Sequence, residues 1–470
     1  MLEKNGQKIL MKREHSKIFF PFVIIVFSLI MGVVISLFRF ERLEVTTSLT
    51  FLLVILFPMS IKILRQNKHN LDVFEPILLF FSISIIHFVL PVWLWKSFNI
   101  QFRLYRNPDV NRAILTYLLA FLFYIFGYYL FFKNTNILLN TKKDKILPIT
   151  WNSKKARTIG NIFVIFSVAI YIYRFWLAGG FFEYLSLLQY RLIAFQGQGY
   201  ILAGKFIPIP ILIISLIEVC STKETKRRDL FRVILIALIS IAQLYLGGGR
   251  ASFILVLLII FAMINYFKKK VSINIILTFT VLAMVFSFYY LVFTRGTIKI
   301  DNSKIIQEIN YVTKSAVTAG DLNEIFVFSD VLTKVPYQIP YQYGKTYLAL
   351  VTLPIPSKIY PNKLPEAGYF WTQSVYPDYS KYSSLGMPCV GELYLNFGYF
   401  GIMLGMFLLG SVSKLLYLHV MKNLTIGSGF FYAVFIYFFY LYLTRGFVIA
   451  LYPSIIILII GLAIIRFSEA

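Results

Sequence analysis

The chain alternates long apolar runs with short polar segments, and this pattern predicts an all-α polytopic membrane protein. A helix that crosses a hydrocarbon core of about 30 Å needs roughly 17 to 25 apolar residues. Twelve runs meet this requirement, with approximate bounds 18–38, 47–64, 76–95, 113–132, 159–178, 202–219, 230–247, 251–267, 272–293, 394–416, 427–443 and 447–466. The first run is too long for a simple cleaved signal peptide.

The basic residues of the loops predict the orientation of these helices. Lys and Arg collect in the N-terminal tail and then in every second loop, for example in residues 142–157 and 268–270. Because loops rich in Lys and Arg stay in the cytoplasm, twelve spans place both chain termini on the cytoplasmic side. Eleven or thirteen spans would break this alternation.

One segment is different, because the 100 residues from Thr294 to Leu393 contain no spanning run. We therefore divide a single membrane domain into residues 1–293, a large extracytoplasmic loop at 294–393, and residues 394–470. Helical spacing of apolar residues in 302–335 predicts one or two amphipathic helices. Residues 340–388 are rich in Pro, Tyr and Gly, which predicts extended and turning backbone. We expect the loop to form a lid over an outward-facing cavity.

Composition narrows the classes of function. Hydrophobic residues make up 58% of the chain and charged residues 14%, which excludes a soluble enzyme. The net charge of +25 suggests a nucleic acid or an anionic membrane surface as partner. Because the chain has long apolar runs, we expect the partner to be membrane lipid. The sequence has no phosphate-binding loop and no metal-binding motif of the HExxH or CxxC type. We therefore expect no cofactor, no metal and no nucleic acid.

Titratable residues within the spans are rare. Ion-coupled carriers usually place charged residues in the middle of the membrane, and here such residues lie near span ends, which argues against a proton-driven carrier. His87 lies inside the third span, slightly to the outer side of its middle. It is either a packed structural residue or a general base that faces the cavity.

Four arginines fall at outer loops or outer span ends: Arg191, Arg250, Arg295 and Arg445. An arginine side chain donates pairs of hydrogen bonds to phosphate oxygens and keeps its charge, so it suits a pyrophosphate. The three glycines before Arg250 would let backbone amides and a helix N-terminus approach an anion. The alternative is that these arginines contact lipid headgroups, and for Arg250 and Arg445 we favour the functional interpretation.

Aromatic residues are concentrated in the outer loop. Tyrosines between positions 337 and 382, with Phe370 and Trp371, could stack on sugar rings or pack the loop itself. The pattern leaves both interpretations open.

Several loop segments resemble Wzy-type O-antigen and oligosaccharide repeat-unit polymerases. They are residues 343–347 (Tyr-Gly-Lys-Thr-Tyr), residues 353–365 with their repeated prolines, the Gly-Gly-Arg-Ala-Ser turn at 248–252, and residues 391–401 from Gly391 and Glu392 onward. The resemblance is strong in the loop and extends over most of the chain at lower similarity.

The resemblance implies a membrane-embedded, metal-independent, inverting glycosyltransferase with a GT-C-like fold. It would move a growing glycan from undecaprenyl pyrophosphate onto the non-reducing end of a lipid-linked repeat unit of O-antigen, common-antigen or capsule type. On this basis Arg250, Arg295 and Arg445 hold the pyrophosphate with help from Arg191. Glu324, Asp321 or Glu392 is the general base, with His87 or the acceptor phosphate as substitutes. The proposed glycan contacts are Tyr343, Lys345, Tyr347 and Trp371.

Two other functions are open to the sequence. O-antigen ligases share this layout but typically use a histidine in the outer loop, and this loop has none. A lipid-linked oligosaccharide flippase or polysaccharide exporter would need an open central path and no long outer lid. The resemblance also implies a bacterial plasma (inner) membrane, an active site on the periplasmic or external side, and a possible Wzz-type chain-length co-polymerase as partner.

Overall fold

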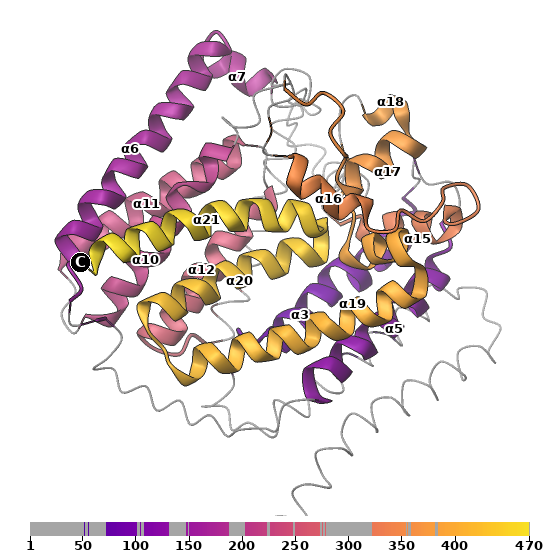
Figure 1. The fold of residues 1–470 in the computed structure, drawn as a ribbon, viewed down its shortest axis with the longest axis horizontal. Helices are drawn as coiled ribbons and strands as arrows, with labels where there is room; N and C mark the ends of the chain where they lie inside the picture. The colour runs from indigo at the N-terminus through magenta and orange to yellow at the C-terminus, as the bar shows by residue number, and fades with distance from the viewer. Residues whose placement is uncertain are drawn as a thin grey trace, which may run out of the picture. The chain divides into compact units, whose positions relative to one another are not determined.

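The described parts of the chain are mostly helical and contain no β-strand (Figure 1). The computed structural model describes residues 72–100, 108–130, 147–148, 150–187, 203–222, 226–247, 250–272, 322–353, 359–380 and 384–469, with isolated positions 51, 55, 104, 275, 278 and 355. The helices, with the π-helix η1 and the 3₁₀-helix η4, are α3 (Pro76–Ser84), η1 (Ile85–Val89), α4 (Leu90–Ser97), α5 (Val110–Leu130), α6 (Ser153–Leu177), α7 (Phe181–Leu187), η4 (Gly204–Phe206), α10 (Pro208–Ser221), α11 (Arg227–Leu246), α12 (Arg250–Phe267), α15 (Glu324–Lys334), α16 (Lys345–Thr352), α17 (Ala367–Val375), α18 (Pro377–Ser380), α19 (Cys389–Lys422), α20 (Ile426–Arg445) and α21 (Phe447–Ser468).

Eight of the described helices are long and apolar enough to cross a membrane, and each coincides with a predicted span. They are Pro76–Ser97, Val110–Leu130, Ser153–Leu177, Gly204–Ser221, Arg227–Leu246, Cys389–Lys422, Ile426–Arg445 and Phe447–Ser468. The eighth predicted span corresponds to α12. The first, second and ninth fall almost entirely outside the described residues. A helical, multi-pass membrane protein is therefore established, whereas twelve spans and their orientation stay predictions.

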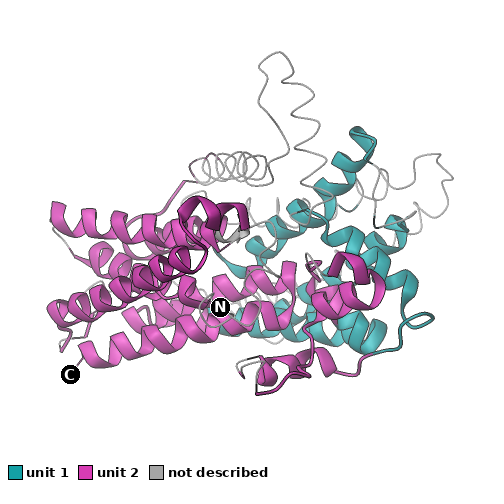
Figure 2. Ribbon diagram, turned by 90° about the horizontal axis from the view of Figure 1, so that it is seen from above, with its two compact units in different colours: residues 1–136, 322–341, 393–417 teal, residues 137–321, 342–392, 418–470 magenta. Residues whose placement is uncertain are grey.

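The chain divides into two compact units, which Figure 2 shows in different colours. Unit 1 comprises residues 1–136, 322–341 and 393–417, and unit 2 comprises 137–321, 342–392 and 418–470. The predicted outer loop is thus shared, because α15 belongs to unit 1 and α16 to α18 belong to unit 2.

In unit 1, small residues bring α5 and α19 together. A Cβ added at Gly127 would collide with the backbone of Phe407, and one at Gly410 would collide with the backbone of Tyr124. The hydroxyl of Ser411 donates to the carbonyl of Gly127 at 3.1 Å. Such close backbone approach at small residues is typical of helix packing in membranes, where dispersion contacts replace hydrophobic burial.

Buried polar groups also connect the helices of unit 1. The carboxylate of Glu75 accepts a hydrogen bond from Tyr128 at 2.7 Å and lies 3.5 Å from Lys414 Nζ. Tyr417 donates to Asp72 at 2.8 Å. A buried charge is tolerated only when it is paired or hydrogen-bonded, and this network meets that condition.

In unit 2, α20 and α21 form a helical hairpin whose arms run side by side, drawn in yellow tones in Figure 1. The hairpin packs on α10, and α20 also packs on α12. A capping box of Thr425 and Ser428 starts α20. The turn between the two arms is a single residue, Gly446, so the end of one span and the start of the next are tightly coupled.

The loop contains more helix than its composition predicts. We expected extended and turning backbone over residues 340–388, and this prediction is wrong for three segments, which form α16, α17 and α18. Gly344, with φ 87°, precedes α16, and the side chain of Glu366 caps α17 by accepting from Gly368 N and Tyr369 N. Gly and Pro residues therefore mark the starts of short helices here. The predicted amphipathic helix in 302–335 is confirmed in part by α15, and residues 302–321 lie outside the described residues.

Candidate active site

The turn that carries Arg445 has a backbone conformation that only glycine adopts easily. Arg445 is the last residue of α20, Gly446 follows with φ 91° and ψ 174°, and Phe447 begins α21. This conformation is open almost exclusively to glycine. A cation at the C-terminus of a helix interacts favourably with the helix dipole, so the location suits Arg445.

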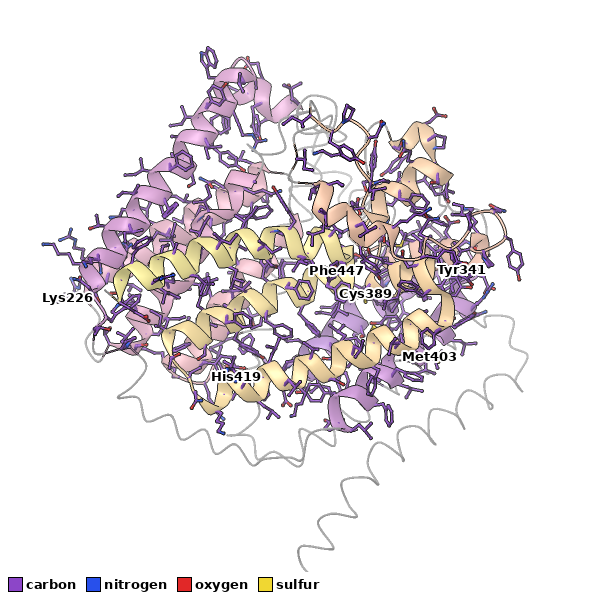
Figure 3. All side chains as sticks on the ribbon, viewed as in Figure 1. Lys226, Tyr341, Cys389, Met403, His419 and Phe447 are labelled. Atoms are coloured by element: carbon purple, nitrogen blue, oxygen red, sulfur yellow. The ribbon has the colours of Figure 1, made fainter. Side chains whose placement is uncertain are left out.

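Glu392 holds this turn from the start of α19. One carboxylate oxygen of Glu392 accepts from the backbone N–H of Phe447 at 2.6 Å, and the other accepts from the hydroxyl of Thr346 at 3.2 Å. Glu392 is 1% exposed. It therefore supplies the N-terminal cap that α21 lacks in its own sequence. Figure 3 labels Cys389 and Phe447, the first residues of the two helices that meet here.

The loop also contacts Arg445 directly. The guanidinium of Arg445 lies so close to Gly386 that a Cβ at this position would collide with it. The backbone next to Gly386 is fixed, since Leu385 N donates to the hydroxyl of Thr372 on α17 at 2.9 Å. Three segments far apart in sequence, around Thr346, around Gly386 and at 445–447, are thus brought together in unit 2.

Two titratable loop groups near this region are shifted by burial. Burial raises the pKa of the Glu366 carboxyl, while hydrogen bonds from Gly368 N, Tyr369 N and the Ser384 hydroxyl oppose the shift. Burial also raises the pKa of Tyr347, and its ring packs edge-on against Phe447 with centroids 5.4 Å apart. Tyr347 is therefore a neutral phenol at physiological pH that supports the Arg445 turn.

The other residues predicted to contact glycan differ in exposure. Tyr343 is 74% exposed, and Lys345 is also exposed at the start of α16. Trp371, in contrast, is 0% exposed. A stacking contact between Trp371 and a sugar would require its indole ring to be uncovered first.

A second pair of candidate functional side chains, a histidine and a glutamate, lies in unit 1. His87 Nδ1 and Glu324 Oε2 are 3.1 Å apart, and both side chains are buried. His87 is in the π-helix η1, and Pro91 follows four residues later. Proline has no N–H for the carbonyl four residues before it, which explains the widened helical turn. Glu324 is the first residue of α15, which packs on η1 and α5.

The structure says less about the other residues that the sequence predicts for the site. Arg250 is the first residue of α12. Asp321, Arg191 and Arg295 lie outside the described residues. Within the described part of the chain, no group of three or more His, Cys, Asp or Glu residues is arranged to hold a metal ion.

The sequence analysis missed three features of this site: the contact of Thr346 with Glu392, the contact of Gly386 with Arg445, and the pairing of His87 with Glu324. Thr346 and Glu392 both belong to segments that carry the resemblance, so their types were visible in the sequence. Their contact was not, because they are 46 residues apart.

Eight helices among the described residues are long and apolar enough to cross a membrane, and they define a multi-pass, helical membrane protein. The family model for "O-antigen polysaccharide polymerase Wzy" matches residues 17–469. The chain therefore belongs to the Wzy family of O-antigen polymerases, as the resemblance of its loop segments predicted. No curated protein and no solved structure matches it.

Proposed function

We propose that this protein elongates a bacterial surface polysaccharide by transferring the growing glycan from undecaprenyl pyrophosphate to the non-reducing end of a lipid-linked repeat unit. The observation that carries this proposal is the Arg445 turn, which Glu392 and the loop hold in place. Family membership supports polymerisation of lipid-linked repeat units, and the arginine turn supports a pyrophosphate as leaving group.

The reaction is a substitution at the anomeric carbon of the donor. The acceptor hydroxyl oxygen forms a bond to this carbon, and the bond from the carbon to the pyrophosphate oxygen breaks with its electron pair on the oxygen. Attack from the opposite face inverts the anomeric configuration. Arg445 would neutralise the charge that develops on the pyrophosphate, together with Arg250, Arg295 and Arg191. With arginines supplying positive charge, we infer a metal-independent reaction.

A base must take the proton of the acceptor hydroxyl. We assign this role to Glu324, because an imidazole 3.1 Å away can orient the carboxylate and share the proton. Asp321, three residues earlier in the sequence, is the alternative carboxylate. Glu392 already accepts hydrogen bonds from Phe447 and Thr346, so we assign it the positioning of Arg445.

The glycan would contact the exposed face of the loop, where Tyr343 and Lys345 lie. Tyr347 and Trp371 would support that face from inside. The site would open to the periplasm or the cell exterior at the plasma membrane, and a Wzz-type co-polymerase would regulate chain length.

The test is polymerisation by purified protein in nanodiscs, supplied with undecaprenyl-pyrophosphate-linked repeat units and no nucleotide. We expect a ladder of lengthened products. Arg445→Ala should reduce turnover about 10²- to 10³-fold, the usual effect of removing one group that stabilises transition-state charge. Arg466→Ala is the matched control, because Arg466 is an arginine at the other end of α21. Equal activity of both variants would rule out the role of Arg445.

A further inference from the structure

The C-terminal end of α11 is held by side chains from three other elements of unit 2. The hydroxyl of Tyr171 donates to the carbonyl of Gln243 at 2.6 Å, and that of Tyr184 donates to the carbonyl of Leu246 at 2.6 Å. Lys205 Nζ lies 3.5 Å from the carbonyl of Gly247. The last four carbonyls of a helix lack partners within the helix, so these contacts fix an end that would otherwise fray.

Arg174 organises the two tyrosines. Its guanidinium carbon lies 4.9 Å from the centroid of the Tyr171 ring and 4.8 Å from that of the Tyr184 ring. Arg174 is 1% exposed and Tyr184 is fully buried. The cation therefore stacks on both rings while their hydroxyls reach the helix end, and its charge complements the negative end of the α11 dipole.

The clamped helix end leads directly to Arg250. Only Gly248 and Gly249 separate Gly247 from Arg250, the first residue of α12. Three virtual bonds of 3.8 Å limit the Cα atoms of Gly247 and Arg250 to about 11 Å apart. With so short a connection, the location of Arg250 depends on where α11 ends and on the packing of α12 against α11.

From this arrangement we propose that Arg174, Tyr171, Tyr184 and Lys205 are positioning residues for Arg250. They fix the end of α11 so that Arg250 meets the pyrophosphate of a lipid-linked substrate. This inference rests on the proposed role of Arg250. A misplacement of about 1 Å at a reacting group can reduce the rate about 10²-fold, so loss of a single hydroxyl donor is measurable.

The experiment is a double-mutant cycle with Tyr184→Phe and Arg250→Lys in the nanodisc polymerisation assay, with the affinity for undecaprenyl pyrophosphate measured in parallel. Tyr184→Phe keeps the ring on Arg174 and removes only the hydroxyl donor. We expect a roughly tenfold loss of kcat/KM and weaker binding of the pyrophosphate lipid. In the Arg250→Lys background, Tyr184→Phe should have little further effect. Tyr173→Phe is the matched control, because Tyr173 is an exposed tyrosine on α6, next to Arg174 in the sequence.

Each outcome decides between the alternatives. Equal fractional losses in both backgrounds would mean that Tyr184 only stabilises the fold, and the inference would be wrong. Full activity of Tyr184→Phe beside an impaired Arg250→Lys would also overturn the inference and leave the proposed function intact. Full activity of Arg250→Lys and of Arg250→Ala would instead remove Arg250 from the proposed function. If Tyr184→Phe does not fold, Lys205→Gln enters the same cycle.

Discussion

Glu324 in unit 1 and Glu392 in unit 2 are alike in sequence context and differ in their partners. Each is in the first turn of a helix, and each is buried. Glu324 Oε2 lies 3.1 Å from Nδ1 of the buried imidazole of His87. Glu392 accepts from a backbone N–H and a threonine hydroxyl, neither of which ionises at physiological pH.

Burial alone therefore does not separate the roles that we propose for the two carboxylates. The carboxylate of Glu392 caps a helix, and its two oxygens are held in place by a backbone N–H and a hydroxyl. The carboxylate of Glu324 has an imidazole as its neighbour, a group with both a donor and an acceptor nitrogen when it is neutral. For this reason we propose Glu324, and not Glu392, for proton transfer.

Replacing Glu324 should have the largest effect on catalysis. Glu324→Gln preserves the shape of the side chain and removes its ability to accept a proton, so we expect kcat to fall about 10²- to 10⁴-fold. The measurement is product formation in nanodiscs, with thermal unfolding recorded to show that the protein is folded.

His87→Gln should also lower kcat, because the imidazole that lies 3.1 Å from the Glu324 carboxylate is lost. Wild-type turnover in both variants, with Asp321→Asn also active, would remove these carboxylates from the mechanism. Glu392 and the acceptor phosphate would then be the remaining candidate bases.

Gly446→Ala changes the turn that Glu392 holds, and it should have an intermediate effect on turnover. The new Cβ would be 2.8 Å from Glu392 Oε2 and 3.1 Å from the carbonyl of Met387, at a backbone conformation unsuited to alanine. Strain of this kind costs about 1–3 kcal/mol. We expect a lower melting temperature and a marked loss of polymerisation, because the Arg445 turn must rearrange. Unchanged melting and turnover would show that the turn tolerates another conformation.

Glu392→Gln should have the smallest effect on rate. The amide keeps one acceptor for Phe447 N and loses the charge, so we expect a stability loss of about 1–3 kcal/mol. Turnover should fall by less than the roughly 10²-fold that marks loss of a general base. Glu366→Gln is the control, because Glu366 caps α17 in the same loop. A loss of turnover as large as that of Glu324→Gln would reverse the roles assigned to the two glutamates.

The sequence was informative about helices and poorly informative about contacts. Apolar runs located every candidate membrane span among the described residues to within a few positions, with two exceptions. The helix α6 begins six residues earlier than predicted, and α19 begins five residues earlier and ends six residues later. The helices of residues 340–388 were missed, because short helices begin at Gly, Pro and capping residues that also occur in turns. The candidate arginines and carboxylates were identified by type, and their partners were not.

Local chemistry explains what the sequence by itself determined. A segment of about 20 apolar residues must form a helix in hydrocarbon, since every backbone polar group needs a partner there, and this holds whatever the neighbours are. The motif residues likewise predicted the family. Only the tertiary structure decided that Glu392 caps α21, that Glu324 pairs with His87, and that Gly386 lies against Arg445. These contacts join residues tens to hundreds of positions apart, and their formation depends on how helix ends pack in three dimensions.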